Sequence, residues 1–251
     1  MTSLINFAKN IIENEAPNVN ETCMSVIHPE IFVRNRSINL FVGKPGTSKT
    51  TSICQELIKI SALQIPENHL IIWVNNTSSD RTVNAYKKHI KIPLIQLDYD
   101  TFNDIYPQFL QIKDDYNKMI NNEIPKDDSI LDSLYISRFT SKPLQTIIIL
   151  DDAVNILKDT ESYLAKSLYR TRHSNCLFFI AIQIWRGITA QLKSIINSVW
   201  IFSGFSPQIL HHIYNQISTD VSFDEFKKIY NSLDNYEKVI CDISSGNIIV
   251  N

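Results

Sequence analysis

Several features that mark common classes of protein are missing from this sequence. The four cysteines in 251 residues, Cys23, Cys54, Cys176 and Cys241, are widely spaced and form no CxxC pair. Zinc sites and disulfide scaffolds need closer spacing, so we expect reduced thiols. The longest apolar run, around 176–182, is much shorter than the roughly 20 residues that span a bilayer. With no signal-peptide pattern at the amino terminus, we expect a soluble, intracellular protein without membrane insertion.

A strong charge of one sign is missing as well. The net charge is -2 and the pI is near 6.3, so no basic field indicates nucleic-acid binding. This does not exclude a DNA partner, because a ring-shaped motor concentrates its basic groups on a narrow inner surface. The length and the 44% hydrophobic content fit one α/β domain with a proper core, and a second full domain is not expected.

Short apolar runs alternate with helical periodicity along the chain. Strands are predicted at 38–42, 70–74, 92–97, 146–150, 177–182 and 199–202, and in a carboxyl-terminal hairpin of 239–243 and 248–250. Helices are predicted at 4–13, 51–63, 102–120, 161–169, 207–217 and 223–233. Such alternation is typical of a mainly parallel sheet covered by helices on both faces, a three-layer α/β/α sandwich that binds ligands at the carboxyl ends of its strands.

Composition also suggests how the chain is divided. We expect an amino-terminal helix and lead-in (1–36), a central core (37–217), and a carboxyl-terminal helix and hairpin appended to the core (218–251). Residues 121–143 are polar, contain two prolines and have IPKDDS at their centre. We expect this segment to be a mobile surface insertion in the core.

The loop after the first strand carries the clearest motif. It matches G-x-x-x-x-G-K-[ST], except that Ser48 replaces the last glycine. A tight turn of this kind points backbone N–H groups at phosphates, and the helix that follows begins there with its positive dipole end. The motif predicts nucleotide contacts from Gly43, Lys44, Pro45, Gly46, Thr47, Ser48, Lys49, Thr50 and Thr51. Lys49 would reach the β- and γ-phosphates, and the Thr50 hydroxyl would bind Mg²⁺.

Two alternatives apply to this loop. An ordinary strand–turn–helix connection can also contain glycine, proline and lysine. If the motif is real, Ser48 either lies in an allowed region of backbone space or adopts a positive φ, which costs serine on the order of 1 kcal/mol or more and could weaken nucleotide binding.

A second motif follows the most apolar strand of the chain, where Asp151 and Asp152 come directly after four apolar residues. This is the Walker B arrangement. It predicts that Asp151 binds Mg²⁺ beside Thr50, at the ends of adjacent strands, and that Asp152 orients or deprotonates the attacking water. Gln183 ends the next strand and would contact the γ-phosphate or that water. A helix N-cap at Asp152 and a surface amide at Gln183 are the alternatives.

Basic residues give weaker signals. Arg170, Arg172 and Arg186 surround the carboxylate region, and an arginine from a neighbouring subunit stabilises transferring phosphate in multimeric ATPases; a helix-end cation is an equal alternative for Arg172. The cluster from Lys87 to Lys91 could face DNA, although a solvated surface is favoured. His211 and His212 lack partners at metal-ligand spacing and are taken as ordinary histidines.

Together these motifs resemble the genome-packaging ATPases of nucleocytoplasmic large DNA viruses and related smaller viruses, which belong to the FtsK–HerA superfamily of P-loop motors. The resemblance rests on FVGKPGTSKTT, IIILDDA and RTRHSNCLFFIAIQIWR, and covers roughly residues 37–205. It implies ATP and Mg²⁺ as cofactors, nucleotide contacts at 43–51, and magnesium at Thr50 and Asp151. It further implies water activation at Asp152, a sensor at Gln183 and a trans-acting arginine at Arg172 or nearby.

The resemblance also implies a function. A homo-oligomeric ring, a pentamer or hexamer, would translocate double-stranded DNA into a preformed capsid, in contact with capsid vertex proteins. The place implied is the host cytoplasm, at the viral factory or on the virion. Two other hypotheses stay open: a small nucleotide kinase, and a nucleotide-gated assembly factor that does not hydrolyse ATP. The kinase lacks its usual arginine-rich lid here, and Ser48 makes the assembly factor plausible.

Overall fold

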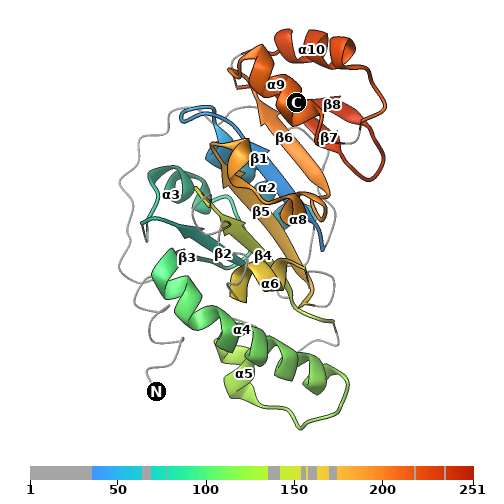
Figure 1. The fold of residues 1–251 in the computed structure, drawn as a ribbon. Helices are drawn as coiled ribbons and strands as arrows, with labels where there is room; N and C mark the ends of the chain where they lie inside the picture. The colour runs from blue at the N-terminus through green and yellow to red at the C-terminus, as the bar shows by residue number, and fades with distance from the viewer. Residues whose placement is uncertain are drawn as a thin grey trace.

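The computed structural model describes residues 36–63, 69–77, 79–134, 142–153, 157, 163–169, 174–217, 219–234 and 236–251. An eight-stranded sheet runs through this part of the chain in the order β3-β2-β4-β5-β1-β6-β7-β8 (Figure 1). The strands are β1 (Ile38–Val42), β2 (His69–Asn75), β3 (Leu94–Asp98), β4 (Gln145–Leu150), β5 (Cys176–Ile182), β6 (Ser198–Phe202), β7 (Lys238–Asp242) and β8 (Ile248–Val250). β1 to β6 pair in parallel, and β7 and β8 extend the sheet antiparallel.

Helices cover both faces of this sheet. They are α2 (Lys49–Leu63), α3 (Arg81–Lys87), α4 (Tyr99–Ile120), α5 (Asp128–Ser133), α6 (Tyr163–Leu168), the 3-10 turn η3 (Trp185–Gly187), α8 (Ala190–Lys193), α9 (Pro207–Tyr214) and α10 (Phe223–Asn231). α9 and α10 lie beside β6 to β8 at one end of the molecule, and α4 and α5 lie at the other (Figure 1).

The core is divided by the sheet into two apolar layers, because successive strand side chains point to opposite faces. In β1, Leu40 joins the layer that also contains the buried side chains of α4, α6, α9 and α10, while Phe41 joins the layer under α2 and α3. The ring of Phe41 stacks on Trp200, with ring centroids 4.6 Å apart. The three-layer α/β/α architecture with a mainly parallel sheet, predicted from the sequence, is confirmed.

All the predicted strands are present, with ends shifted by one or two residues, and so are the predicted helices within the described residues. The helix predicted at 4–13 lies outside the described residues. α3 was not predicted. Its seven residues bury only Val83 and Tyr86, so the chain there shows no clear helical period.

The segment 121–143, predicted as a mobile insertion, contains a helix that packs on the rest of the domain. Within it, α5 is capped by Asp127, whose carboxylate accepts a hydrogen bond from the Ser129 N–H. Leu131 and Leu134 are buried in the larger apolar layer, and α5 contacts α4. A few well-placed apolar side chains are enough to dock a polar segment, which composition alone does not reveal. Residues 135–141 lie outside the described residues.

A buried lysine of α4 forms hydrogen bonds with residues at the amino ends of two central strands. Lys113 is 2% exposed, and its Nζ donates hydrogen bonds to Thr146 Oγ1 (2.8 Å) and the Asn175 carbonyl (3.0 Å). Nζ also lies 3.6 Å from Cys176 Sγ. Burial lowers the pKa of Lys113, because removal from water disfavours the charged ammonium. The lysine therefore bridges a helix and two strands at the end of the sheet opposite the glycine-containing loop.

Two expectations about composition can be compared with the structure. Cys54, Cys176 and Cys241 are buried free thiols, as expected, and Cys23 lies outside the described residues. Among the described residues, no helix combines the length and the apolar character that a membrane span requires.

Candidate functional site

The glycine-containing loop is a tight turn between β1 and α2. The Gly43 N–H donates to the Ile182 carbonyl (3.2 Å), and the Thr47 hydroxyl donates to the Lys44 carbonyl (2.8 Å). A Cβ on Gly43 would lie 2.4 Å from Thr47 Oγ1 and 2.9 Å from Phe202 Cβ, so only glycine fits between the turn and β6. Gly46 has φ +77°, which glycine adopts without strain.

Ser48 adopts the strained conformation that the sequence left open. Its φ is 66°, in the left-handed region where a side chain costs roughly 1–2 kcal/mol. Its carbonyl accepts a hydrogen bond from the Ser52 N–H (2.9 Å), which begins the ladder of α2. The backbone therefore has the conformation that glycine would adopt without strain at this position. With serine there, the Cβ makes the same conformation strained.

Lys49 points its ammonium back into the loop. The side chain is buried, and Nζ donates to the carbonyls of Gly43 (2.8 Å) and Lys44 (3.0 Å). Burial lowers the pKa of Lys49, and the negative charges of Asp151 and Asp152 act in the opposite direction. A buried cation held by two backbone carbonyls inside a turn at a helix N-terminus is well suited to phosphate oxygens.

Thr50 and Asp151 meet although their strands are not neighbours. The Thr50 hydroxyl donates to Asp151 Oδ2 at 3.1 Å. The expectation of adjacent strands was wrong: β5 lies between β1, which leads into the loop, and β4, which leads into Asp151. The two groups still converge because Thr50 stands on the first turn of α2, beyond the end of its own strand.

Asp151 is held by several contacts. Its N–H donates to the Val74 carbonyl (2.8 Å), and its own carbonyl accepts from the Tyr99 hydroxyl (2.6 Å). Burial raises the pKa of Asp151 to about 6, the Thr50 hydrogen bond and Lys49 oppose this, and the negative charges of Asp152 and Asp80 add to it. A carboxylate that is poorly stabilised without a cation favours binding of one.

Asp152 and Gln183 also meet. The Gln183 amide donates to Asp152 Oδ1 at 2.6 Å, across the ends of the paired strands β4 and β5. Asp152 is exposed and has φ 56°, a conformation that Asp tolerates better than most residues. The helix N-cap alternative for Asp152 depends on residues 154–156, which lie outside the described residues.

One acidic residue near the site was missed by the sequence analysis. Asp80 follows β2 and caps α3, accepting from the Val83 N–H (3.0 Å), while its own N–H donates to Gln96 Oε1 (3.1 Å). Its charge contributes to the raised pKa of Asp151. The signal was the polar run after the strand at 70–74, which ends at the same edge of the sheet as β4.

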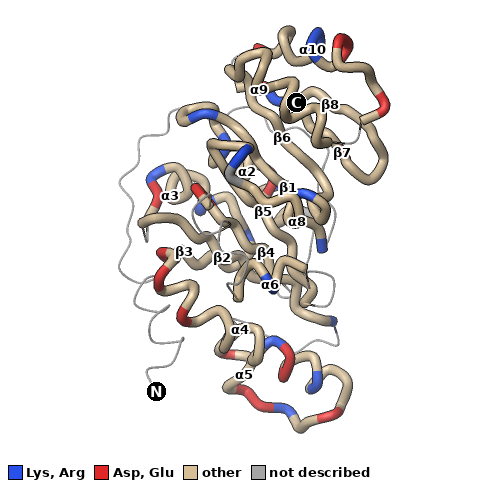
Figure 2. The backbone as a smooth tube through the Cα atoms, viewed as in Figure 1, with Lys and Arg blue, Asp and Glu red and all other residues tan. Residues whose placement is uncertain are grey.

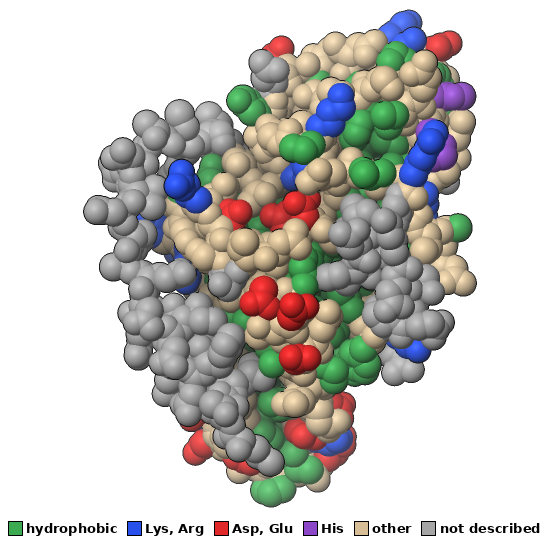
Figure 3. Space-filling model, turned by 60° about the vertical axis from the view of Figure 1, so that its left-hand side comes forward, with side chains coloured by type: hydrophobic (Ala, Val, Ile, Leu, Met, Phe, Trp, Pro, Cys, Tyr) green, Lys and Arg blue, Asp and Glu red, His purple; other side chains and the backbone are tan. Residues whose placement is uncertain are grey.

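Acidic side chains are grouped on the face that comes forward in Figure 3, and Figure 2 shows acidic residues at the start of α4.

No group of three His, Cys, Asp or Glu side chains able to hold a metal ion occurs among the described residues. Mg²⁺ in nucleotide sites takes most of its oxygens from phosphate and water, so one carboxylate and one hydroxyl suffice. Asp151 and Thr50 fit that role, and the nearby negative charge would disfavour a bare polyphosphate.

The basic candidates are less clearly placed. Arg170 and Arg172 lie outside the described residues. Arg186 is exposed in η3, directly after the strand that ends near Gln183. Lys88, directly after α3, and Lys91, between α3 and β3, are exposed, in agreement with a solvated surface.

The histidine pair lies on α9, with the His211 ring 4.5 Å from Phe223 and His212 near Gln216. These are packing and surface contacts of the kind expected for ordinary histidines.

The chain was compared with protein families, curated proteins and solved structures. No family model matches the chain, and no curated protein matches its sequence. The genome packaging NTPase B204 from Sulfolobus turreted icosahedral virus 2, in complex with AMPPCP, has a similar structure: the TM-score is 0.57 at 17% identity, over 86% of this chain and 97% of that one. For B204, the DNA-packaging ATPase from Sulfolobus turreted icosahedral virus, the TM-score is 0.54 at 16% identity, with the same coverage of 86% and 97%. The cytoplasmic domain of EssC gives 0.51 at 12%, over 74% of this chain and 37% of that one.

At identities this low, the structural similarity shows a shared fold and nothing finer. Two of these neighbours are viral packaging ATPases, which agrees with the resemblance drawn from the loop and strand motifs. This chain therefore has the α/β fold of P-loop ATPases, in a form similar to that of a viral genome-packaging enzyme.

Proposed function

We propose that this protein is a Mg²⁺-dependent ATPase that moves double-stranded DNA into a preformed viral capsid. The observation that carries the ATPase assignment is the convergence of Lys49, Thr50 and Asp151 at one end of the sheet, with Thr50 and Asp151 hydrogen-bonded at 3.1 Å. Lys49 is the cation that contacts the β- and γ-phosphates, and the loop 43–51 cradles the phosphates.

Each remaining residue has a proposed role in hydrolysis. Thr50 and Asp151 hold Mg²⁺, which when bound neutralises phosphate charge. Asp152 orients the attacking water and accepts its proton. Gln183 holds Asp152 in place through their hydrogen bond and senses the γ-phosphate. Arg172 is proposed to act on the nucleotide of the neighbouring subunit.

The motor assignment rests on the likeness to the packaging enzymes and on the motif resemblance. It includes a homo-oligomeric ring around DNA, contacts with capsid vertex proteins, and action in the host cytoplasm. A second candidate function is a nucleotide-gated assembly factor that does not hydrolyse ATP. The strained positive φ of Ser48 is the observation that favours it. A nucleotide kinase is the third.

Phosphate release from ATP tests the enzymatic assignment. Wild type should release phosphate, Lys49→Ala should lose nucleotide binding, and Asp152→Asn should bind ATP but turn it over about 10²–10⁴-fold more slowly. Lys126→Ala is the control, because this lysine is exposed and forms a surface ion pair with the exposed Asp128. Equal release by wild type, Lys49→Ala and Asp152→Asn would refute the assignment. ATP binding without release in wild type would favour the assembly factor.

DNA separates the motor from the kinase. Double-stranded DNA should stimulate turnover, and the stimulation should fall as salt rises, because phosphate contacts displace counterions. Turnover that ignores DNA but phosphorylates a nucleoside monophosphate would favour the kinase.

A further inference from the structure

The strand order suggests how a nucleotide would be oriented in the proposed triphosphate site. Asp152 and Gln183, which would meet the γ-phosphate, stand at the ends of β4 and β5. β5 pairs with β1 on one side, and β6 pairs with β1 on the other. We therefore expect a nucleotide whose γ-phosphate points toward Asp152 to extend its nucleoside toward the β6 side of the loop.

The segment found on that side is the loop 203–206, between β6 and α9. It follows directly on Phe202, the last residue of β6, whose Cβ lies 2.9 Å from where a Gly43 Cβ would be. Within the loop itself, a Cβ on Gly204 would lie 3.9 Å from Lys44 Cδ. The four residues carry no charged side chain, and Ser203 and Phe205 are partly exposed. Neutral polar and aromatic groups suit a ribose and a base better than a phosphate.

A buried hydroxyl fixes the shape of this loop. Tyr230, on α10, donates a hydrogen bond from its hydroxyl to the Phe202 carbonyl (2.8 Å) and accepts one from the Phe205 N–H (2.9 Å). The two bonds join both ends of the turn, where Gly204 has φ +98°. Tyr230 is 6% exposed, so its ring is held in the core while its hydroxyl ties the turn together.

We propose that the loop 203–206 binds the nucleoside part of the nucleotide, and that Tyr230 is the positioning residue that sets this subsite. This inference rests on the proposed ATPase function and adds to it the second half of the binding site. It assigns a role to the carboxyl-terminal helix α10, which otherwise lies outside the phosphate chemistry. The subsite contacts ribose and base, and the phosphates are bound independently by the loop 43–51.

Comparing ADP with inorganic tripolyphosphate tests this division, because tripolyphosphate has the phosphates without the nucleoside. Binding of each would be measured by calorimetry with Mg²⁺ present. Tyr230→Phe keeps the ring and removes both hydrogen bonds, so the turn loses its fixed shape. We expect ADP affinity to fall about three- to tenfold and tripolyphosphate affinity to stay within about twofold of wild type.

Tyr214→Phe is the matched control, since the Tyr214 hydroxyl donates to the Val221 carbonyl (2.8 Å), a hydrogen bond between two residues outside the loop 203–206. It should change neither affinity. Gly204→Ala is a second, independent variant, because a side chain at φ +98° strains the backbone of the turn, while the new methyl group would make an ordinary van der Waals contact with Lys44 Cδ at 3.9 Å. It should weaken ADP alone, and it carries the test if Tyr230→Phe does not fold.

The outcomes separate the two proposals. If Tyr230→Phe and Gly204→Ala leave ADP affinity unchanged, or weaken ADP and tripolyphosphate equally, the nucleoside subsite is wrong while the phosphate site stands. If wild type binds neither compound, the proposed ATPase function itself fails.

Discussion

The side-chain amide of Gln183 donates a 2.6 Å hydrogen bond to Oδ1 of Asp152, joining the ends of two neighbouring strands. The bond orients the carboxylate proposed to handle the attacking water. An amide can do this without adding charge, whereas a carboxylate at the same position would repel Asp152.

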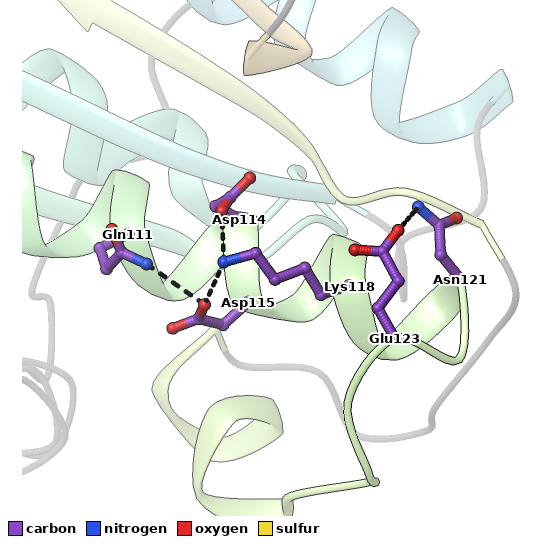
Figure 4. A network of polar contacts seen from close by, with 6 residues as sticks. All are labelled: Gln111, Asp114, Asp115, Lys118, Asn121 and Glu123. Carbon is purple, nitrogen blue, oxygen red and sulfur yellow. Dashed lines mark hydrogen bonds and ion pairs between the residues drawn. The ribbon is translucent and has the colours of Figure 1, made fainter.

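The first prediction follows from this pair. Gln183→Ala should lower kcat about 10-fold or more with little change in KM, because the carboxylate loses its orientation while the phosphate loop is intact. Gln183→Glu should be at least as slow. Gln111→Ala is the control, since Gln111 donates to Asp115 Oδ1 (3.2 Å) in a similar exposed pair on α4 (Figure 4). Normal kcat in Gln183→Ala would remove Gln183 from the mechanism.

The second prediction concerns Ser48, in the loop between β1 and α2. Ser48→Gly should raise the free energy of unfolding by about 1 kcal/mol, because glycine adopts φ 66° without the steric cost that serine bears. Gly46→Ala should do the opposite by a similar amount, since its φ is +77° and a Cβ there meets nothing within 4 Å. Urea denaturation of the ligand-free protein measures both. A loss of stability in Ser48→Gly would mean that Ser48 makes a compensating contact.

The third prediction concerns pH. Burial, followed by the charges of Asp152 and Asp80, raises the pKa of Asp151 to about 6. Binding of Mg²⁺ requires the deprotonated carboxylate, so Mg²⁺-dependent ADP affinity should fall as the pH drops below about 6, by about tenfold per unit. Asp152→Asn removes one charge that raises this pKa, so its acid limb should lie at lower pH. If ADP affinity begins to fall at the same pH in wild type and Asp152→Asn, another group controls binding.

Linkage gives the same group an opposite effect on stability. Because the folded pKa of Asp151 lies above its unfolded value, its contribution to stability is complete at low pH and is lost as the pH rises through about 6. Asp151→Asn should therefore make the ligand-free protein more stable than wild type at pH 7, while abolishing the gain in stability that Mg²⁺ and ADP give to wild type. Thermal unfolding with and without ligand shows both effects.

The fourth prediction compares two lysines of α4. Lys113→Ala should lower the free energy of unfolding by about 2–5 kcal/mol, because it leaves a cavity and deprives the Thr146 hydroxyl and the Asn175 carbonyl of their buried donor. Lys118→Ala is the control: this exposed lysine pairs with Asp114 (2.9 Å) and Asp115 (3.1 Å) on the surface, where ion pairs contribute little (Figure 4). Similar unfolding midpoints for the two variants would show that Lys113 is not structurally important.

The fifth prediction concerns the proposed trans-acting arginine. Arg172→Ala should bind ATP normally and lose turnover, since the residue would act on the transition state in the next subunit. Mixing Arg172→Ala with Lys49→Ala subunits should restore part of the activity, because an intact site can then receive an intact arginine. Arg186→Ala is the comparison. If Arg172→Ala hydrolyses normally and Arg186→Ala does not, the arginine is Arg186.

The sequence by itself was sufficient for the strands, the tight turn after β1 and the two aspartates that follow β4. These features are local: a buried strand has a short apolar run, and the glycine-containing turn and the aspartates follow their strands directly in the chain. The sequence could also place Gln183 beside Asp152, because the carboxyl ends of parallel strands share one edge of the sheet.

Only the tertiary structure decided which strands are neighbours and what else reaches the site. The insertion of β5 between β1 and β4, the approach of Asp80, the positive φ of Ser48 and the Tyr230 clamp on the loop 203–206 all depend on contacts between residues far apart in the chain. Such contacts leave no period or spacing in the sequence, since they arise from how crossovers order the strands and how helices pack on them.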